Sequence, residues 1–226
     1  MEEPDPNDGI MDVLILTGYD DAFAGIGDVT TPAKRAYAER HGYTFKCVRD
    51  YPTGVHPSWH KLQMLKDRID SHDAIVWLDA DSVITNPDIN VMDLAAPTIL
   101  TASQDWCAPL DEFPADAKGI NFGNFILRNT PRTRTWLSEA AKHTQFASRS
   151  TCCWEQDAVL KCMRELHWFN AEVTRLPRRA LNAVHPECEL PSIKAPDPWQ
   201  PGDFLIHLTN VPDRAAKARY YAGFHT

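Results

Sequence analysis

Apolar runs alternate with amphipathic stretches along the chain, and this pattern predicts an α/β fold. Residues 11–17 (MDVLILT) form a continuous apolar run, which is typical of a strand buried on both faces of a parallel sheet. Thr31 followed by Pro32 fits a helix N-cap with proline at the first helical position, so we expect a helix to begin there. Gly42 would end it, and a second strand is expected at residues 43–48.

The rest of the chain continues the same alternation. We expect helices over residues 58–70 and 154–166, after Thr130-Pro131 and from Pro212 onward, and strands over residues 74–84, 98–102, 124–128 and 203–208. Residues 186–201 are rich in proline and predict a loop. Because no linker or repeat interrupts the pattern, we predict an acidic leader over residues 1–10 and one domain over residues 11–226, with a mixed, Rossmann-like sheet flanked by helices.

Composition excludes some function classes without choosing one. The chain has 226 residues and a formal net charge of −8, which argues against a nucleic-acid partner. No apolar run approaches the roughly 18 residues of a membrane helix, and the acidic, proline-containing leader is unlike a signal peptide. We therefore expect a cytoplasmic protein without a transmembrane segment. Six cysteines without a CxxC pair predict free thiols, although one or two disulfides in a lumenal enzyme remain an alternative.

The strongest chemical signal is the pair Asp79 and Asp81 at the end of an apolar strand. In an extended chain, residues two apart point to the same face, so both carboxylates project together. Two such charges repel each other and resist desolvation, and a divalent cation removes both penalties. Carboxylate oxygens suit Mg²⁺ or Mn²⁺. A solvated turn is the alternative interpretation of this short motif.

Three further segments carry polar residues where a ligand could bind. His207 is flanked by apolar residues, so it is a packing residue unless its strand end lies beside Asp81. Residues 155–157 (Glu-Gln-Asp) open a helix, where acidic side chains either complement the helix dipole or face a sugar. Residues 121–124 contain two asparagines and a glycine, and a β-turn explains them equally well.

Taken together, these segments resemble glycosyltransferase family 34, which includes fungal α-galactosyl- and α-mannosyltransferases and plant xyloglucan xylosyltransferases, and more broadly the single-domain GT-A enzymes. The matching segments, in the order of the family, are Trp59–Leu62, Trp77–Asp81 with Asn86-Pro87, Asn121–Phe125 with Leu127–Asn129, Glu155–Ala158 and Gly202–His207. Two departures concern the sugar and acceptor end of the site. No glycine follows His207 closely, and Phe122 stands where the family usually has a small residue.

The resemblance implies a GT-A fold with the Asp-x-Asp motif at a strand end. It implies transfer of a hexose or pentose from a nucleotide-diphosphate sugar, with UDP favoured over GDP, to a carbohydrate acceptor with retention of configuration. It implies Mn²⁺ or Mg²⁺ on Asp79, Asp81 and His207, donor contacts from Thr17, Gly18, Tyr19, Lys61, Asp79, Ala80, Asn121 and Asn124, and a catalytic set of Gln156, Glu155 and Asp157. Tyr19 would stack on the base. Gln156 would lie beneath the sugar, and because an amide is a weak nucleophile, front-face attack is implied.

Two alternatives use the same residues differently. Asp79 to Val83 also fits the Asp-x-Asp-x-(Thr/Val) nucleophile motif of haloacid-dehalogenase-like phosphatases. That motif normally follows the first strand of its domain, whereas a predicted strand, helix and strand precede it here. A non-catalytic domain that binds sugar nucleotides would present the same donor and metal ligands without turnover.

Overall fold

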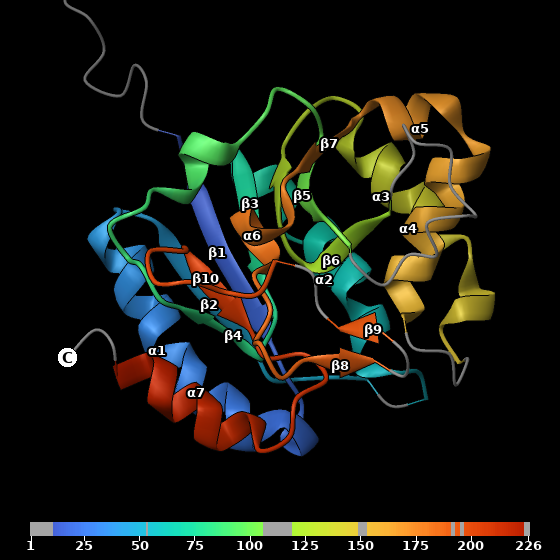
Figure 1. Ribbon diagram of the computed structural model, residues 1–226. Coiled ribbons are helices and arrows are strands. Elements are labelled where there is room, and N and C mark those ends of the chain that lie inside the picture. The colour runs from blue at the N-terminus through green and yellow to red at the C-terminus, as the bar shows by residue number, and fades with distance from the viewer. Residues whose placement is uncertain are drawn as a thin grey trace, which may run out of the picture.

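A six-stranded mixed sheet forms the centre of the protein (Figure 1). The computed structural model describes residues 11–52, 54–105, 119–148, 153–190, 193–194 and 197–223. The strand order is β2-β1-β3-β6-β5-β7, and the strands are β1 Val13–Gly18, β2 Thr44–Val48, β3 Ala74–Leu78, β5 Leu100–Gln104, β6 Ile120–Arg128 and β7 Val173–Leu176. β1 runs parallel to β2 and β3, and β5 runs parallel to β7. β6 is antiparallel to both of its neighbours.

Two small antiparallel sheets lie beside the central one. β4 (Ser82–Ile84) pairs with β10 (Leu205–His207), and β8 (Glu189–Leu190) pairs with β9 (Ile193–Lys194). In the first of these, His207 lies opposite Ser82. Because β4 follows β3 after only three residues, this pairing brings the end of the last strand to the end of a central strand.

Helices cover both faces of the central sheet (Figure 1). They are α1 Ala24–Arg40, α2 His60–Lys66, α3 Thr133–Ala141, α4 Trp154–Glu165, α5 His167–Ala171, α6 Arg178–Asn182 and α7 Arg214–Ala222. Short 3-10 helices span Asp21–Phe23, Pro57–Trp59, Ile69–Ser71, Val91–Leu94 and Thr144–Phe146.

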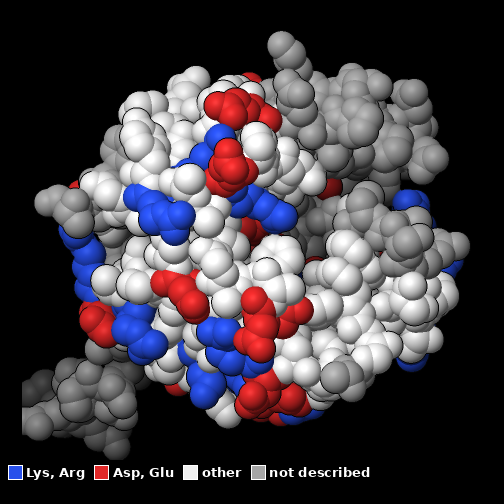
Figure 2. All heavy atoms as spheres, turned by 90° about the horizontal axis from the view of Figure 1, so that it is seen from below, with Lys and Arg blue, Asp and Glu red and all other residues white. Residues whose placement is uncertain are grey.

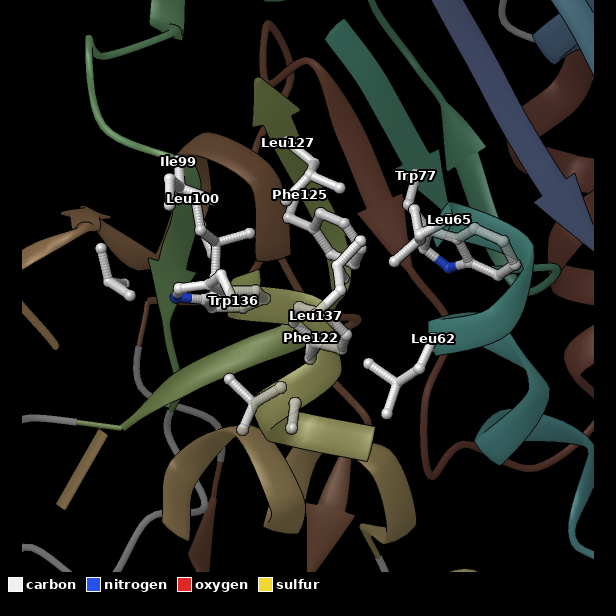
Figure 3. Close-up of a cluster of buried hydrophobic side chains, with 14 of the residues drawn as sticks. Leu62, Leu65, Trp77, Ile99, Leu100, Phe122, Phe125, Leu127, Trp136 and Leu137 are labelled. Atoms are coloured by element: carbon white, nitrogen blue, oxygen red, sulfur yellow. The ribbon is translucent and has the colours of Figure 1, made fainter. Parts of the chain in front are cut away.

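Alternation along the strands divides the core between these helix layers. Leu14 and Trp77 belong to the cluster under α2, α3 and α4, whereas Ile15 and Val76 belong to the cluster under α1. Successive side chains of a strand point to opposite faces, so each strand supplies both layers. The cluster under α2, α3 and α4 is rich in aromatic rings, and Figure 3 shows Phe122, Phe125 and Trp136 within it, with the Phe122 ring stacked on that of Phe125.

Most predicted elements are confirmed, with corrections at their ends. The first helix begins at Ala24, not at Thr31, and Pro32 lies inside it. Asp20 caps the preceding 3-10 helix by accepting a hydrogen bond from the Phe23 amide at 3.1 Å, so the chain turns into helix earlier than the proline suggests. Burial of the inner face of α1 compensates for the hydrogen bond that proline cannot donate. Gly42, at φ +70°, ends the helix as predicted.

The sheet also differs from prediction around the polar segments. The run 74–84 is divided into β3 and β4 by the aspartates, and β6 begins at Ile120, so residues 121–124 belong to a strand and not to a turn. The sequence pattern did not predict α5, β7 or α6, and the predicted loop 186–201 contains the β8–β9 hairpin.

Some predictions concern residues beyond the described part of the chain. The leader, residues 1–10, lies outside it, as do Cys107 and Cys152, and the division into one domain stays a prediction. Cys47, Cys162 and Cys188 are free thiols. Within the described ranges, no helix is both long enough and apolar enough to cross a membrane.

Alanine substitutions at two glycines of α1 should change the free energy of unfolding in opposite directions. A Cβ at Gly27 would lie 2.5 Å from ring atoms of Tyr19, whereas a Cβ at Gly25 would meet nothing within 4 Å. We expect Gly27→Ala to lower the free energy of unfolding by about 1–3 kcal/mol through overpacking, and Gly25→Ala to raise it by up to about 1 kcal/mol through helix propensity. Urea denaturation of both variants measures the difference, and equal effects would contradict the contact with Tyr19.

Candidate functional site

The turn between β3 and β4 holds the carboxylate pair. The register pairs Leu78 with Asn124 on β6, and the Asp79 amide then donates to the Gly123 carbonyl at 2.9 Å. The amide of Ser82 donates back to the Asp79 carbonyl at 3.0 Å. β6 therefore fixes the start of the turn, and β4 fixes its end, so that the Asp79 and Asp81 side chains are presented together.

His207 joins the two aspartates from the far end of the sequence. Its Nε2 lies 3.3 Å from Asp81 Oδ1, and potential ligand atoms of Asp79, Asp81 and His207 all lie within 4.8 Å of one another. The sequence suggested His207 as a ligand only if the end of its strand lies beside Asp81, and the structure shows that it does. The other ring nitrogen, Nδ1, lies 2.8 Å from Asn182 Oδ1. Because an amide oxygen only accepts, Nδ1 carries a proton toward Asn182, which leaves Nε2 as the ring nitrogen that would bind a metal ion.

Gly123 leaves the space that these three side chains occupy. A Cβ at this position would lie 2.8 Å from Asp79 Oδ2, 2.8 Å from His207 Cε1 and 2.9 Å from Asn121 Oδ1. Asn121 in turn accepts a hydrogen bond from the Gly123 amide at 2.9 Å. The residues thus fit a cation: two carboxylates and an imidazole nitrogen converge on a cradle that any side chain at position 123 would enter.

The charge around Asp81 is compensated from three directions. Burial alone would raise its pKa, but His207, Arg214 and Lys34 hold the pKa of Asp81 well below its usual range. The pKa of His207 is raised because Asp81 outweighs the lowering effect of burial. Arg214 Nη1 lies 3.3 Å from Asp81 Oδ2, and its side chain is 40% exposed. It is the most exposed of the cations that compensate Asp81, and its guanidinium also lies 5.2 Å from the ring centre of Phe23.

Lys61 is held inside the protein and does not face open space. Its Nζ lies 2.7 Å from Glu155 Oε1, 3.1 Å from Asp79 Oδ1 and 2.7 Å from the Phe122 carbonyl oxygen. These three acceptors occupy all three protons of an ammonium group. Burial lowers the pKa of Lys61, but Asp79 and Glu155 raise it more, and burial raises the pKa of Glu155 to about 7. In this structure Lys61 orients Asp79, whose Oδ1 also accepts from Trp77 Nε1 at 2.6 Å, and the donor contact of Lys61 stays a prediction.

Gln156 is clamped by hydrogen bonds at both ends of its amide. Its Oε1 accepts from the Phe122 amide and its Nε2 donates to Asp105 Oδ2, each at 2.8 Å. Glu155 and Gln156 are buried rather than open to a cleft, and Asp157 is half-buried. The sequence reasoning missed this because it placed only the apolar positions of the helix against the core. Helix α4 buries polar groups as well, because β6 and Lys61 supply partners for them.

Tyr19 cannot offer a free ring face in this structure. Arg49 Cζ lies 4.3 Å from its ring centroid, and a Cβ at Gly27 would lie 2.5 Å from its ring atoms. The Tyr19 hydroxyl donates to Asp28 Oδ1 at 2.8 Å. Because the ring lies between Arg49 and α1, a base could stack on Tyr19 only after Arg49 moved.

The remaining predicted donor residues line the ends of β1 and β3. Thr17 is fully buried, and its Oγ1 has no hydrogen-bond partner among the described residues. Gly18 lies so close to Tyr51 that a Cβ would stand 2.5 Å from its hydroxyl. Ala80 is buried between the two aspartates, and Asn124 accepts a second hydrogen bond from the Asp79 amide at 3.3 Å.

Residues that the sequence reasoning missed support the site from other elements. Lys34 of α1 donates to the Asp79 carbonyl at 2.6 Å, Asn182 of α6 orients His207, and Arg214 of α7 pairs with Asp81. The sequence offered little signal for Lys34 and Arg214, because each is one basic residue on a helix.

On the side of the molecule where α7 and the β8–β9 hairpin lie, Figure 2 shows basic and acidic side chains interspersed, without a broad basic area.

Comparisons with known sequences find relatives that are glycosyltransferases. Residues 13–104 match the model of the galactosyl transferase GMA12/MNN10 family. The chain is 34% identical to an alpha-1,2-galactosyltransferase of Schizosaccharomyces pombe, over 81% of this chain and 57% of that protein. It is 24% identical to a probable alpha-1,6-mannosyltransferase, MNN10, of Saccharomyces cerevisiae, over 71% of this chain and 48% of that protein. The chain therefore spans about half the length of these relatives.

Solved structures show the same fold. A glycosyltransferase involved in the glycosylation of the major capsid of PBCV-1 superposes with a TM-score of 0.65 at 16% identity, covering 93% of this chain and 98% of that one. The galactosyltransferase LgtC, solved with donor and acceptor sugar analogs, gives a TM-score of 0.57 at 14% identity, covering 93% of this chain and 95% of that one. The resemblance predicted from the sequence is thus confirmed: the chain is related to glycosyltransferase family 34, the galactosyl transferase GMA12/MNN10 family, and has the GT-A fold.

Proposed function

We propose that this protein is a metal-dependent glycosyltransferase that moves a hexose or pentose from a nucleotide-diphosphate sugar to a carbohydrate acceptor. A UDP-sugar is favoured over a GDP-sugar as the donor. The convergence of Asp79, Asp81 and His207 beside Gly123 carries the proposal, because the β3–β4 turn and the end of β10, far apart in the sequence, bring these side chains together at the carboxyl end of β3. Ligands of open α/β sheets bind at that edge.

The proposed cofactor is Mn²⁺, with Mg²⁺ as the alternative. Asp79, Asp81 and the Nε2 of His207 would hold it, and a mixed oxygen and imidazole set suits Mn²⁺ better than Mg²⁺. When bound, such an ion neutralises charge on the leaving diphosphate. Asn182 contributes by keeping the His207 ring in the required tautomer.

Arg214 is the proposed protein cation for the diphosphate. It is 40% exposed and already lies beside Asp81, so it can turn to a phosphate oxygen without leaving the site. A guanidinium forms two parallel hydrogen bonds to phosphate, which orients the group as well as neutralising it. Lys61 is unsuited to this role, since its three protons are held by buried acceptors.

Retention of configuration is part of the proposal, and Gln156 is assigned the position beneath the sugar. Its amide nitrogen is bound to Asp105 and its oxygen accepts from the Phe122 amide. A side chain fixed at both ends orients well but attacks poorly, so attack by the acceptor on the same face as the departing diphosphate is favoured over a covalent intermediate. Glu155 and Asp157 complete this end of the site, with Glu155 acting through Lys61.

A phosphatase of the haloacid-dehalogenase type is no longer favoured. Its nucleophile follows the first strand, whereas Asp79 follows β3 in a GT-A sheet. A domain that binds sugar nucleotides without turnover would use the same ligands, and it is one outcome of the experiments below.

The first prediction concerns the metal ligands. Asp81→Asn keeps the shape of the side chain but removes the charge that faces His207 and Arg214. We expect it to weaken Mn²⁺-dependent UDP binding at least about tenfold, that is, by about 1.4 kcal/mol or more. Calorimetric titration of UDP with and without Mn²⁺ measures this. Asp88→Ala, which removes an exposed surface carboxylate, is the control, and unchanged binding in a folded Asp81→Asn protein would refute the metal assignment.

The second prediction concerns the cradle at Gly123. The added methyl group of Gly123→Ala enters the space between Asp79 and His207. We expect a loss of Mn²⁺ affinity of at least about tenfold, the scale of changes that disturb metal ligands, with a cooperative unfolding transition retained. Mn²⁺ titration followed by electron paramagnetic resonance gives the affinity, and Gly25→Ala serves as the matched control. Full affinity in Gly123→Ala would show that the metal lies elsewhere.

The third prediction separates transfer from binding. We expect Gln156→Ala to leave UDP and Mn²⁺ affinity nearly intact while lowering sugar transfer or donor hydrolysis at least about tenfold. A panel of UDP- and GDP-sugars with and without acceptor measures turnover, and calorimetry measures binding. Binding without any turnover in the wild type would favour the non-catalytic domain. Hydrolysis of an aryl phosphate that is lost in Asp79→Asn but unaffected by Gln156→Ala would instead revive the phosphatase interpretation.

A further inference from the structure

A lysine lies fully buried beneath the turn that carries the carboxylates. Lys34 of α1 has no exposed surface, and its Nζ donates to the Asp79 carbonyl at 2.6 Å, to Thr30 Oγ1 at 3.2 Å and to the Ala80 carbonyl at 3.5 Å. Thr30 adds a hydrogen bond of its own, donated to the Ala80 carbonyl at 2.6 Å. Two residues one helical turn apart on α1 therefore bind two consecutive carbonyls of the turn.

We propose that Lys34 is a positioning residue that sets the conformation of the Asp79–Asp81 turn for metal and donor binding, with Thr30 as its partner. The inference rests on the proposed metal-dependent function and adds a residue to it. Lys34 touches neither the proposed ligand atoms nor the cleft, so it acts through the backbone of the turn.

The hydrogen bonds explain how a residue under the turn controls the side chains above it. With the Asp79 and Ala80 carbonyls directed to α1, both peptide planes on either side of Ala80 are fixed. The Asp79 amide is bound to β6 and the Leu208 amide donates to the Asp81 carbonyl at 2.9 Å. The turn is then anchored at each of its three carbonyls, and the two carboxylates are left on the side of His207.

A positive charge is needed at this place, not merely a side chain that fills space. Burying a lysine among apolar groups is costly, and the burial lowers the pKa of Lys34 to about 8. A methionine would fill the volume at lower cost, but it would leave the Asp79 carbonyl with only the Ser82 amide as donor and the Ala80 carbonyl with only Thr30. The carboxylates of Asp81 and Asp79 act in the opposite direction to burial and favour the charged lysine. The ammonium thus meets two requirements, hydrogen bonding to the turn and charge compensation beneath it.

Helix α1 contacts both the loop after β1 and the turn after β3, which are the two ends of the proposed donor site. The same helix contacts Tyr19 through Gly27 and Asp28, and it contacts the metal turn through Thr30 and Lys34. The loop after β1 and the turn after β3 therefore share one rigid support, which fixes their separation.

The test compares Lys34→Met with Lys46→Met, which makes the same substitution at an exposed position of β2. Thr30→Val provides a milder variant if Lys34→Met folds poorly. Two properties are measured in each protein: Mn²⁺ affinity by electron paramagnetic resonance, and hydrogen exchange of the peptide containing residues 79–84 in the absence of metal. Far-UV circular dichroism and thermal unfolding establish that each variant is folded.

We expect Lys34→Met to weaken Mn²⁺ binding at least about tenfold, as loss of a residue that orients metal ligands does. Exchange at residues 79–84 should become at least about fivefold faster, since the Ser82 amide is bound to the Asp79 carbonyl that Lys34 holds. Thr30→Val should change both in the same direction by a smaller factor, and Lys46→Met should change neither.

The outcomes distinguish this inference from the proposed function. Unchanged Mn²⁺ affinity and unchanged exchange in a folded Lys34→Met protein would overturn the role of Lys34, while the metal site of the wild type would stand. If the wild type bound no Mn²⁺, the proposed function would fall, and the exchange data would still decide whether Lys34 sets the turn. If Lys34→Met did not fold, unchanged affinity and exchange in Thr30→Val would overturn the inference.

Discussion

Two carboxylates held at the end of a buried strand are the constraint on which the site depends. Asp81 is almost fully buried and Asp79 largely so, and charges in such a place are tolerated only when opposite charges or hydrogen-bond donors surround them. The chain supplies these from three helices and one strand. Lys34 comes from α1, Lys61 from α2, Arg214 from α7 and His207 from β10, while Glu155 of α4 balances Lys61. Helices α1, α2 and α7 therefore all contact the same short turn that carries the two carboxylates.

The direction of β6 brings its first residues to that centre. β6 runs antiparallel between β3 and β5, so its first residues, and not its last, lie beside the end of β3. That places Gly123 against the Asp79 backbone and the Phe122 carbonyl against Lys61. A glycine in the middle of a strand usually weakens it, and here it marks a close approach of other groups to the strand.

From the sequence, the framework of the fold and the candidate metal ligands were easier to predict than the contacts that surround them. Apolar runs and helix periodicity located β1, α2, β3, α3 and α4, since those elements are defined by which side chains are buried. The spacing of Asp79 and Asp81 was sufficient to suggest a cation, and the order of segments was sufficient to suggest the family. The start of α1 was wrong because proline indicates a preference and not a boundary. Lys61, Gln156 and Tyr19 were expected to contact the donor, and the sequence did not reveal that they also contact Glu155, Asp105 and Arg49. Contacts of that kind depend on tertiary neighbours far apart in the sequence, which periodicity does not reveal.

The pairing of β10 with β4 has a consequence for how the protein matures. The first two proposed ligands are made early, at positions 79 and 81, whereas the third lies at position 207 and is oriented by Asn182. During synthesis on a ribosome, the central sheet can therefore assemble before any complete metal site exists. Binding of the proposed cation to all three residues would wait until β10 has emerged and paired with β4. Proteolytic removal of the segment from β10 onward would leave the six strands of the central sheet in place but would remove the third of the proposed ligands.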